Sequence, residues 1–320
     1  MTMIQDNTTY SPEFSTRFLL PKYWGVWFGF GLLALVVTVL PYRLLLLLGR
    51  SLGSLAPRIA KKRVAIVRRN LELAFPEMET QEREKIVTEN LKNTGMALIE
   101  TGIAWFWPEW RFKRLVKFQN IEQIVELDQN KKGVLVVCTH ALNLEITARA
   151  FATFAPGYGV YRPHDNPAYD YIQTWGRTRC GNKMVDRKNV KGMLKILRRG
   201  DRLWYLPDHD YGRRNSVFIP FFAIEDACTT AGTGVLIDAS KCAVVTASSF
   251  REGTSYTLQV DNEFSAAFPR KDAEGAALVM NQAIEKVILR GLDQWMWVHK
   301  RFKTMQDASL EKGVRYKNIT

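Results

Sequence analysis

The sequence predicts an α/β protein with a mostly parallel central sheet, flanking helices and an N-terminal membrane helix. Two patterns predict this class. From Gly133 onward, short apolar runs alternate with amphipathic segments of helical length, which is typical of parallel strands joined by helices. Near the N-terminus, residues 23–40 form an 18-residue run without a charge. The chain has 320 residues, 47% of them hydrophobic, which allows a sizeable core and excludes a disordered protein.

The uncharged run over residues 23–40 has the length of a membrane helix. Eighteen residues span roughly 27 Å as a helix, which is close to the hydrocarbon thickness of a bilayer. Tyr23 and Trp24 at its start suit the level of the lipid headgroups. A buried core helix is the alternative interpretation. We expect residues 1–22 to form a tail and residues 23–50 to form a membrane anchor that either crosses the bilayer or only enters it.

Basic residues follow this run more densely than they precede it. Arg17 and Lys22 precede it, whereas eight Lys and Arg residues lie between positions 43 and 69. The positive-inside rule therefore predicts that the chain after residue 41 is cytoplasmic. The stretch over residues 57–70 forms either a helix on an anionic membrane or an ordinary solvated helix. Residues 51–130 are thus expected to be a basic, helical, membrane-proximal region.

The remaining chain, residues 131–320, is expected to form an α/β catalytic core in one domain with the helices before it. No internal repeat or linker marks a second domain. The expected strands cover residues 134–138, 157–161, 183–185, 203–206, 243–250 and 256–260. The expected helices cover residues 71–110, 142–154, 167–179, 188–199, 229–240 and 272–289.

The charge balance calls for an anionic partner. The formal net charge is +13, which suits a nucleic acid, an acidic protein or an anionic membrane with its lipids. The basic residues are spread along the chain without a nucleic-acid motif, so we expect no nucleic acid. A basic, non-enzymatic membrane-binding module remains an alternative. The four cysteines form no C-x-x-C pair, and Cys138 lies in a predicted buried strand, so a reducing compartment is expected and a cysteine nucleophile is not.

One candidate for the chemistry lies directly after the apolar run over residues 134–138. His140 follows this run, and Glu145 lies five residues further on. Ligands bind such sheets beyond the carboxyl ends of the strands. With His140 at a strand end and Glu145 in the next helical turn, the two side chains can converge. A carboxylate on one imidazole nitrogen leaves the other as a general base, which suits deprotonation of a substrate hydroxyl for acyl transfer. A hydrogen-bonded structural histidine is the alternative.

Two further segments place arginines where an anion could bind. Arg162 follows an expected strand and could hold a phosphate or carboxylate, or instead pair with Asp165. Arg177 and Arg179 end an expected helix. They form either a second anion clamp or ordinary charge at the carboxyl end of a helix dipole.

A third segment, residues 205–212, carries Asp208, His209 and Asp210 after another expected strand. These three could ligate a metal in a membrane-bound hydrolase. However, neighbouring residues of an extended segment point in opposite directions, and no second cluster lies at ligand spacing, so no metal is expected. The apolar run over residues 216–222 either lines an acyl-accepting pocket or packs in the core.

Taken in order, these segments resemble the late acyltransferases of bacterial lipid A biosynthesis. That family belongs to a wider superfamily similar to the glycerolipid acyltransferases, which share an H-x-x-x-x-D/E motif. The resemblance covers nearly the whole chain and rests on residues 69–73, 75–77, 104–108, 139–145, 160–167, 173–179, 204–212, 216–222 and 297–304. The blocks YRPHDNP and PDHDYG resemble the lauroyl or palmitoleoyl branch more than the myristoyl branch, where Asp usually replaces Glu145.

The resemblance implies transfer of a fatty acyl chain from acyl carrier protein to a 3-hydroxyacyl hydroxyl of Kdo2-lipid IVA or its acylated product. It implies no cofactor, and a catalytic domain on the cytoplasmic side of the inner membrane. His140 matches the family's base and Glu145 its orienting carboxylate. We expect substrate binding from the five remaining candidates: Arg162, Arg177, Arg179, Asp208 and Asp210. Another glycerolipid or glycolipid acceptor is the alternative.

Overall fold

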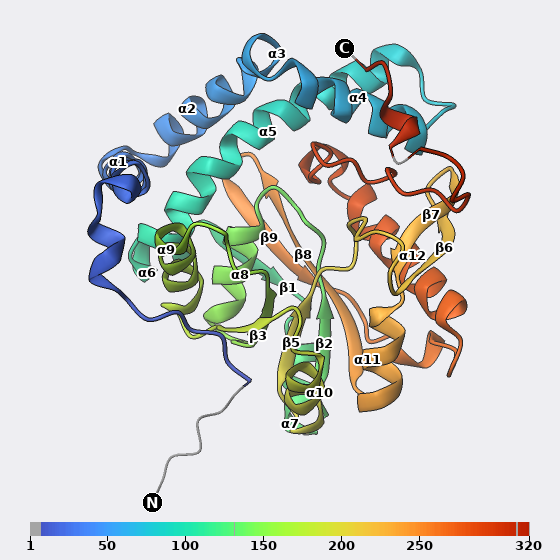
Figure 1. Cartoon of the computed structure of the whole chain (residues 1–320). Helices are drawn as coiled ribbons and strands as arrows, with labels where there is room; N and C mark the ends of the chain where they lie inside the picture. Colours follow the sequence, from blue (N-terminus) through green and yellow to red (C-terminus); the bar gives the residue numbers. More distant parts are fainter. Residues whose placement is uncertain (1–7, 131, 312, 320) are drawn as a thin grey trace, which may run out of the picture.

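The computed structural model describes residues 8–130, 132–311 and 313–319 and confirms the predicted α/β class (Figure 1). Seven strands form one sheet in the order β1-β9-β8-β2-β5-β3-β4, and every neighbouring pair is parallel except β8 with β9. These strands are β1 (Val116–Gln119), β2 (Val134–Val137), β3 (Tyr158–Tyr161), β4 (Lys183–Asp186), β5 (Arg202–Tyr205), β8 (Ala243–Glu252) and β9 (Ser255–Val260). A separate antiparallel pair consists of β6 (Ser216–Phe221) and β7 (Ile224–Thr230).

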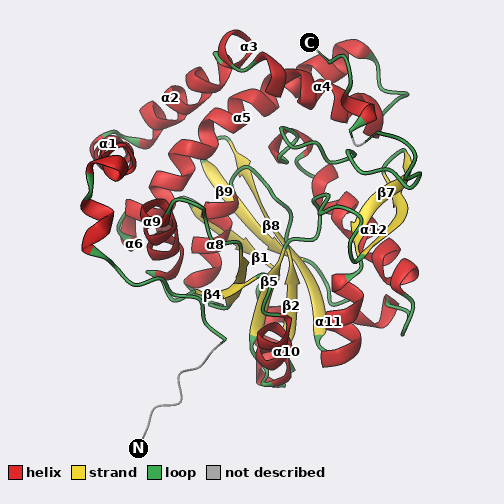
Figure 2. Ribbon diagram, in the orientation of Figure 1, coloured by secondary structure: helices red, strands yellow, loops and turns green. Residues whose placement is uncertain are grey.

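Helices cover both faces of the sheet, so that the strands form a central layer (Figure 2). They are α1 (Trp24–Val39), α2 (Tyr42–Ser54), α3 (Ala56–Ile59), α4 (Lys61–Ala74), α5 (Thr80–Phe106), α6 (Glu109–Lys113), α7 (Glu122–Gln129), α8 (Leu144–Ala152), α9 (Pro167–Thr178), α10 (Val190–Arg198), α11 (Gly232–Ser240) and α12 (Ala273–Leu289). Asn166 and Asp272 cap α9 and α12 through side-chain oxygens, which explains where those helices begin.

The core has two parts, one on each face of the sheet. Leu135 and Val137 of β2 belong to one cluster of buried apolar side chains, and Val134 and Val136 belong to the other. Because side chains alternate along a strand, a sheet buried on both faces needs a continuous apolar run such as this one. The run that predicted a buried strand is therefore the centre of the fold.

Helix α5 supports the N-terminal helices. A Cβ atom added to Gly95 would lie 2.3 Å from the carbonyl oxygen of Gly49, and one added to Gly53 would lie 2.1 Å from that of Leu91. The backbones of α2 and α5 therefore touch at positions where any larger residue would separate them. In Figure 1, α1, α2 and α3 follow the outer edge of the molecule, with α5 between α2 and the sheet.

The structure differs from the sequence-based prediction in several segments. The helix expected over residues 71–110 is divided into the end of α4, α5 and α6, because the chain leaves the helical conformation after Ala74 and again before Pro108. The helix expected from residue 229 begins at Gly232, because residues 224–230 form β7. β1, α7 and the β6–β7 pair were not predicted. The basic stretch over residues 57–70 breaks at Ala60, and α4 buries its inner face. The division into tail, anchor, membrane-proximal region and core stays a prediction, and residues 1–7 of the tail lie outside the described residues.

Candidate active site

The site is built where two neighbouring parallel strands end. Val137 of β2 is paired with Tyr205 of β5, and His140 and Asp208 each lie three residues beyond that pair. Their side chains meet: His140 Nδ1 is 2.7 Å from Asp208 Oδ1. The backbone N–H of His140 also donates to Asp208 Oδ2 at 2.7 Å. The sheet therefore fixes both the imidazole and the loop that carries it.

Asp208 is an ionised, fully buried carboxylate. Trp295 Nε1 donates to its Oδ2 at 2.7 Å. Burial alone would raise the pKa of Asp208, but the His140 imidazole and the hydrogen bonds from His140 and Trp295 hold it below its usual value. An ionised carboxylate only accepts hydrogen bonds, so Nδ1 of His140 carries the shared proton, and in the neutral imidazole Nε2 is the nitrogen with a free lone pair.

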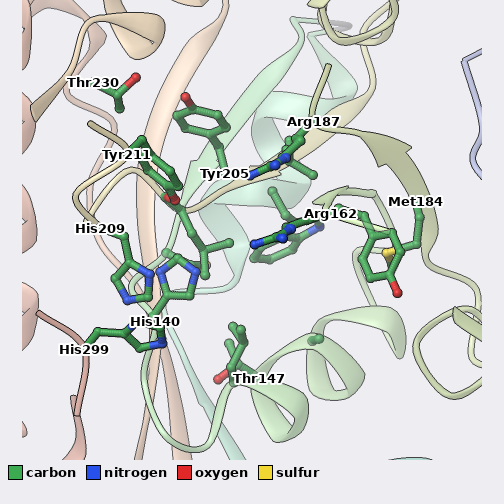
Figure 3. Close-up of a pocket in the computed structure, with 18 of the residues that line it drawn as sticks. His140, Thr147, Arg162, Met184, Arg187, Tyr205, His209, Tyr211, Thr230 and His299 are labelled. Carbon is green, nitrogen blue, oxygen red and sulfur yellow. The ribbon is translucent and has the colours of Figure 1, made fainter. Parts of the chain in front are cut away.

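Two more imidazoles stack behind His140. The His140 and His209 rings are 3.5 Å apart with planes at 10°, and the His209 and His299 rings are 4.6 Å apart. Burial, reinforced by the neighbouring His140, lowers the pKa of His209 to about 2, so this ring is neutral at physiological pH. Figure 3 shows the three rings together at one end of the cavity. The stack fixes the plane of the His140 ring.

The predicted pairing of Glu145 with His140 is not what the structure contains. Glu145 accepts hydrogen bonds from Arg177 Nε at 2.9 Å and from Trp105 Nε1 at 2.9 Å, and Arg177 forms a second bond through its NH2 group. The carboxylate at His140 Nδ1 is Asp208. The physical reason is that the first turn of α8 directs Glu145 toward α5 and α9, whereas Asp208 shares the strand edge with His140.

The three arginine predictions have different outcomes. Arg162 follows β3 and lines the cavity. Among the described residues, none forms a hydrogen bond with its guanidinium, and the alternative ion pair with Asp165 is not formed. Arg177 also lines the cavity; burial alone would lower its pKa, but Glu145 holds that pKa above its usual value. Arg179 is not among the described lining residues. It donates to the carbonyl of Trp105 and lies over the Trp175 ring, and its expected role in substrate binding stays a prediction.

Asp210 holds a loop. Its carboxylate accepts from the Thr304 N–H at 2.8 Å, the Thr304 hydroxyl at 2.9 Å and the Gly212 N–H at 2.9 Å. The side chains of Asp208 and Asp210 thus serve different partners, as expected for an extended segment. The three groups whose ligand atoms lie within 4.8 Å of one another are His140, Asp208 and His209, and Asp208 already accepts three N–H bonds there.

A cavity of about 690 Å³ opens from the imidazoles and is large enough for an extended ligand. Its wall includes apolar side chains from β3, β4, β5, α8 and the residue that follows β2: Cys138, Leu144, Ala148, Val160, Met184 and Trp204. Burial raises the pKa of the Cys138 thiol, which makes it a wall residue and not a nucleophile. In Figure 3, Met184 lies on the side opposite the histidines, and Arg162 and Arg187 lie between them.

Sequence reasoning missed several residues of this site. None of the described lining residues comes from 216–222; that run packs in the core through Ile219 and Phe221, as its alternative interpretation held. Trp295 was not predicted, and His209 was considered only as a possible metal ligand, because nothing in their local pattern indicates a tertiary partner. His140 and Asp208 lie at equal offsets from their strand ends, but this offset pairs them only once β5 is known to lie beside β2.

Comparison with known proteins identifies the family to which the chain belongs. Residues 11–304 match the family described as bacterial lipid A biosynthesis acyltransferase. The chain is 49% identical over 300 residues to a lipid A biosynthesis lauroyltransferase of Escherichia coli K12, covering 93% of this chain and 97% of that one. It is 29% identical to the lipid A biosynthesis myristoyltransferase of the same organism, over 96% and 95% of the two chains.

Among solved structures, a 1-acyl-sn-glycerophosphate acyltransferase from Thermotoga maritima covers 74% of this chain and 96% of its own, with 12% identity and a TM-score of 0.35. The family match spans nearly the whole chain, and the lauroyltransferase is far more similar than the myristoyltransferase. The chain therefore belongs to the bacterial lipid A biosynthesis acyltransferase family, in its lauroyltransferase branch.

Proposed function

We propose that this acyltransferase moves a fatty acyl chain from acyl carrier protein to a 3-hydroxyacyl hydroxyl of Kdo2-lipid IVA or its acylated product. The observation that carries the proposal is the His140–Asp208 pair, which directs Nδ1 to the carboxylate and leaves Nε2 as the available base beside a cavity of about 690 Å³ with an apolar wall. An imidazole base and an acyl-sized cavity are what direct transfer to a hydroxyl requires.

The mechanism needs no enzyme nucleophile. Nε2 of His140 takes the hydroxyl proton while the oxygen attacks the thioester carbonyl. The C–S bond then breaks, and the imidazolium returns the proton to the departing thiolate. Asp208 stabilises the imidazolium between these steps. The positive end of α8, which begins four residues after His140, and the cationic side chain of Arg177 stabilise the oxyanion.

The anionic groups of both substrates account for the basic residues. Six cationic side chains line the cavity: Arg162, Arg177, Arg187, Lys300, Arg301 and Lys303. They suit the phosphates and Kdo carboxylates of the acceptor, and the net charge of +13 suits an acidic carrier protein. In this proposal Glu145 is a positioning residue that holds Arg177 against the cavity wall.

We place the enzyme at the cytoplasmic face of the inner membrane. Residues Pro21–Val39 are long and apolar enough to cross a bilayer, and only 11% of that segment is buried in the protein. The basic residues that follow α1 favour the cytoplasmic side. Carrier protein and acceptor would then meet at one surface.

The test is acyl transfer by the purified full chain in detergent. Kdo2-lipid IVA is supplied with a panel of acyl carrier protein thioesters, with and without EDTA. Product that persists in EDTA supports the proposal, and the panel identifies the chain. Absence of product from folded protein with every thioester would contradict it, and transfer to a glycerolipid instead would favour the alternative acceptor. Loss of activity in EDTA would support a metal at His140, Asp208 and His209.

Replacing Arg162 with Ala is expected to raise KM for the acceptor about 10- to 100-fold with little change in kcat. A hydrogen bond to a charged group contributes about 1.5–3 kcal/mol, and that interaction is made in the ground state as well as the transition state. Steady-state kinetics at saturating thioester measures this. Arg179→Ala is the matched control, because Arg179 is also an exposed arginine but lies outside the described cavity wall. Equal effects of the two changes would remove Arg162 from the acceptor site.

Replacing Ala148 with Leu is expected to shift the preferred thioester to a shorter chain. Ala148 lies on the cavity wall, and its larger replacement would occupy space for about three methylenes. Since each buried methylene contributes about 0.8 kcal/mol, kcat/KM for the longest accepted chain falls by about tenfold or more. Competition between thioesters in one reaction measures the shift. An unchanged ranking would place the acyl chain elsewhere.

A further inference from the structure

We infer that α1 lies within one membrane leaflet instead of crossing the bilayer, so that the segment before it stays on the same side as the catalytic site. This inference rests on the proposed membrane attachment and not on the reaction. It depends on one feature of the structure: both ends of α1 are fixed to the same folded body.

The segment before α1 is bound to the edge of the sheet. The backbone N–H of Tyr10 donates to the Met184 carbonyl of β4 at 2.7 Å, and its hydroxyl donates to Asp170 of α9 at 2.6 Å. The rings of Phe14 and Phe18 lie 5.4 and 6.0 Å from that of Tyr171, also on α9. The chain that enters α1 therefore starts from the catalytic core.

The first and middle turns of α1 then pack along that core. Trp27 Nε1 donates to the Phe18 carbonyl at 2.7 Å, which ties the first turn of α1 to the segment before it. Phe30 stacks on Trp105 of α5 with ring centres 5.5 Å apart. Leu33 and Val37 are buried where a Cβ atom on Gly102 of α5 would lie 2.8 Å from each.

The far end of α1 is held by polar bonds. Trp107 Nε1 donates to the Val37 carbonyl at 2.6 Å. Arg111 donates to the carbonyls of Thr38 at 2.8 Å and Leu40 at 2.7 Å. These are the unpaired carbonyls of the last helical turn, and a guanidinium satisfies them.

A helix that crosses a bilayer has its ends on opposite sides of about 30 Å of hydrocarbon. Here the N-terminal side of α1 bonds to α9 and β4, and its C-terminal side bonds to the α5–α6 corner. Crossing would break one set of bonds or draw charged groups such as Asp170 and Arg111 into hydrocarbon, at a high cost. The helix can satisfy both sets of bonds only if it lies along the surface of the core.

The outward face of α1 indicates what this helix contacts on the side away from the core. Trp24, Phe28, Leu32, Leu35 and Val39 recur every three or four residues and are 52–73% exposed. Exposed apolar residues continue along α2 and α3: Leu44, Leu47, Leu52, Leu55 and Ile59. Soluble proteins rarely expose a patch of this extent.

Exposed basic residues occur on the segments that carry this apolar face and next to them: Arg17, Lys22, Arg43, Arg58, Lys61 and Lys62. Exposed apolar and basic residues on the same segments fit the acyl chains and anionic headgroups of a single phospholipid leaflet. A second copy of this chain would bring like charges together, so it is the poorer partner.

The first experiment locates residue 9. Thr9→Cys is made in a full-length Cys180→Ser chain, because the other three cysteines are buried and Thr9 is exposed. A membrane-impermeant maleimide is added to Gram-negative cells whose outer membrane has been made permeable. Ser309→Cys, exposed on the catalytic core, is the matched control, and a periplasmic cysteine protein reports reagent entry.

We expect Thr9→Cys and Ser309→Cys to be equally protected in intact cells, at least tenfold relative to the periplasmic protein, and equally labelled once the inner membrane is opened. Labelling of Thr9→Cys in intact cells while Ser309→Cys stays protected would overturn the inference. If the chain does not sediment with membranes, the proposed attachment fails instead.

The second experiment measures depth. Spin labels are placed singly at Phe28→Cys and Val39→Cys in the Cys180→Ser chain, in vesicles of phosphatidylglycerol and phosphatidylethanolamine. These positions are about 16 Å apart along a helix axis, at 1.5 Å per residue. Relative accessibility to oxygen and to a nickel complex gives each depth. We expect nearly equal, shallow depths, whereas a difference close to 16 Å would establish a crossing helix.

Discussion

Replacing His140 with Asn is expected to lower kcat by about 10²–10⁴, the usual contribution of a general base. Asn keeps an N–H near the position of Nδ1 and can still donate to Asp208, but it has no basic nitrogen in place of Nε2. His140→Ala is a less specific change, because it leaves Asp208 buried with one fewer hydrogen bond and so lowers stability as well. Single-turnover acyl transfer with saturating thioester and acceptor measures the chemical step.

His299→Asn is the matched control for this prediction. His299 lines the same cavity and belongs to the same stack, but Asp208 accepts no bond from it among the described contacts. We expect its kcat to stay within about tenfold of the wild type. The general-base assignment is wrong if His140→Asn retains that much activity, or if both variants lose activity equally while keeping the wild-type melting temperature.

The sequence was a good guide to the fold where the signal was local. Buried strands such as 134–138 and helices with a clear cap, such as the one that starts after Asp272, lie where the pattern placed them. β1 has one half-buried and three exposed residues, so it lacks the apolar run that marks a strand. The last two residues of β7, Thr229 and Thr230, were taken for the start of a helix because they adjoin α11 without a strong break.

The site was harder to predict, because its contacts depend on strand order. His140 was correctly placed at a strand end, but its partner was sought within the next helical turn. The true neighbour comes from β5, and the sequence alone does not indicate that β5 lies beside β2. Trp295 reaches Asp208 from 87 residues away, on a segment held by Asn90 through the Trp295 carbonyl at 2.7 Å. Contacts of this kind follow from the fold and not from a motif.

Long-range contacts of this kind also connect α1 to the site. Phe30 of α1 stacks on Trp105, whose indole N–H donates to Glu145, and Glu145 holds Arg177 at the cavity wall. If α1 lies in the leaflet, it contacts both the lipid and Trp105, the side chain that supports Glu145. This arrangement gives a physical reason for Glu145 to matter without touching His140.

Replacing Asp208 with Asn is expected to reduce kcat by about 10³–10⁴, nearly as much as removing the base. Two N–H groups, from the His140 backbone and from Trp295, donate to Oδ2. In the variant the amide oxygen must stay at that position to accept them, so the amide NH2 replaces Oδ1 and faces Nδ1. Nδ1 then has to accept a hydrogen bond from this NH2 group, so the imidazole proton moves to Nε2. In this tautomer Nε2 cannot act as the base. Transient kinetics measures kcat, and ¹⁵N NMR of the imidazole identifies the tautomer.

The Asp208 change also has a pH signature. Because the pKa of folded Asp208 lies below its ordinary value of 3.8, its ionised form stabilises the fold at pH above about 4, and this contribution is lost as the pH falls through the folded-state pKa. Wild-type stability is therefore expected to fall more steeply below pH 4 than that of Asp208→Asn, as measured by thermal unfolding across pH 2–7.

Two matched controls distinguish the His140–Asp208 pair from the His140–Glu145 pair that the sequence predicted. Asp210→Asn changes a carboxylate two residues away that bonds Thr304 and Gly212, so it should alter stability without changing the His140 tautomer. Glu145→Gln can still accept from Arg177, so its loss in kcat should be smaller than that of Asp208→Asn. If Glu145→Gln abolishes activity while Asp208→Asn retains it, then Glu145 reaches His140 in the reacting complex, and the arrangement of the free enzyme is not the one that catalyses transfer.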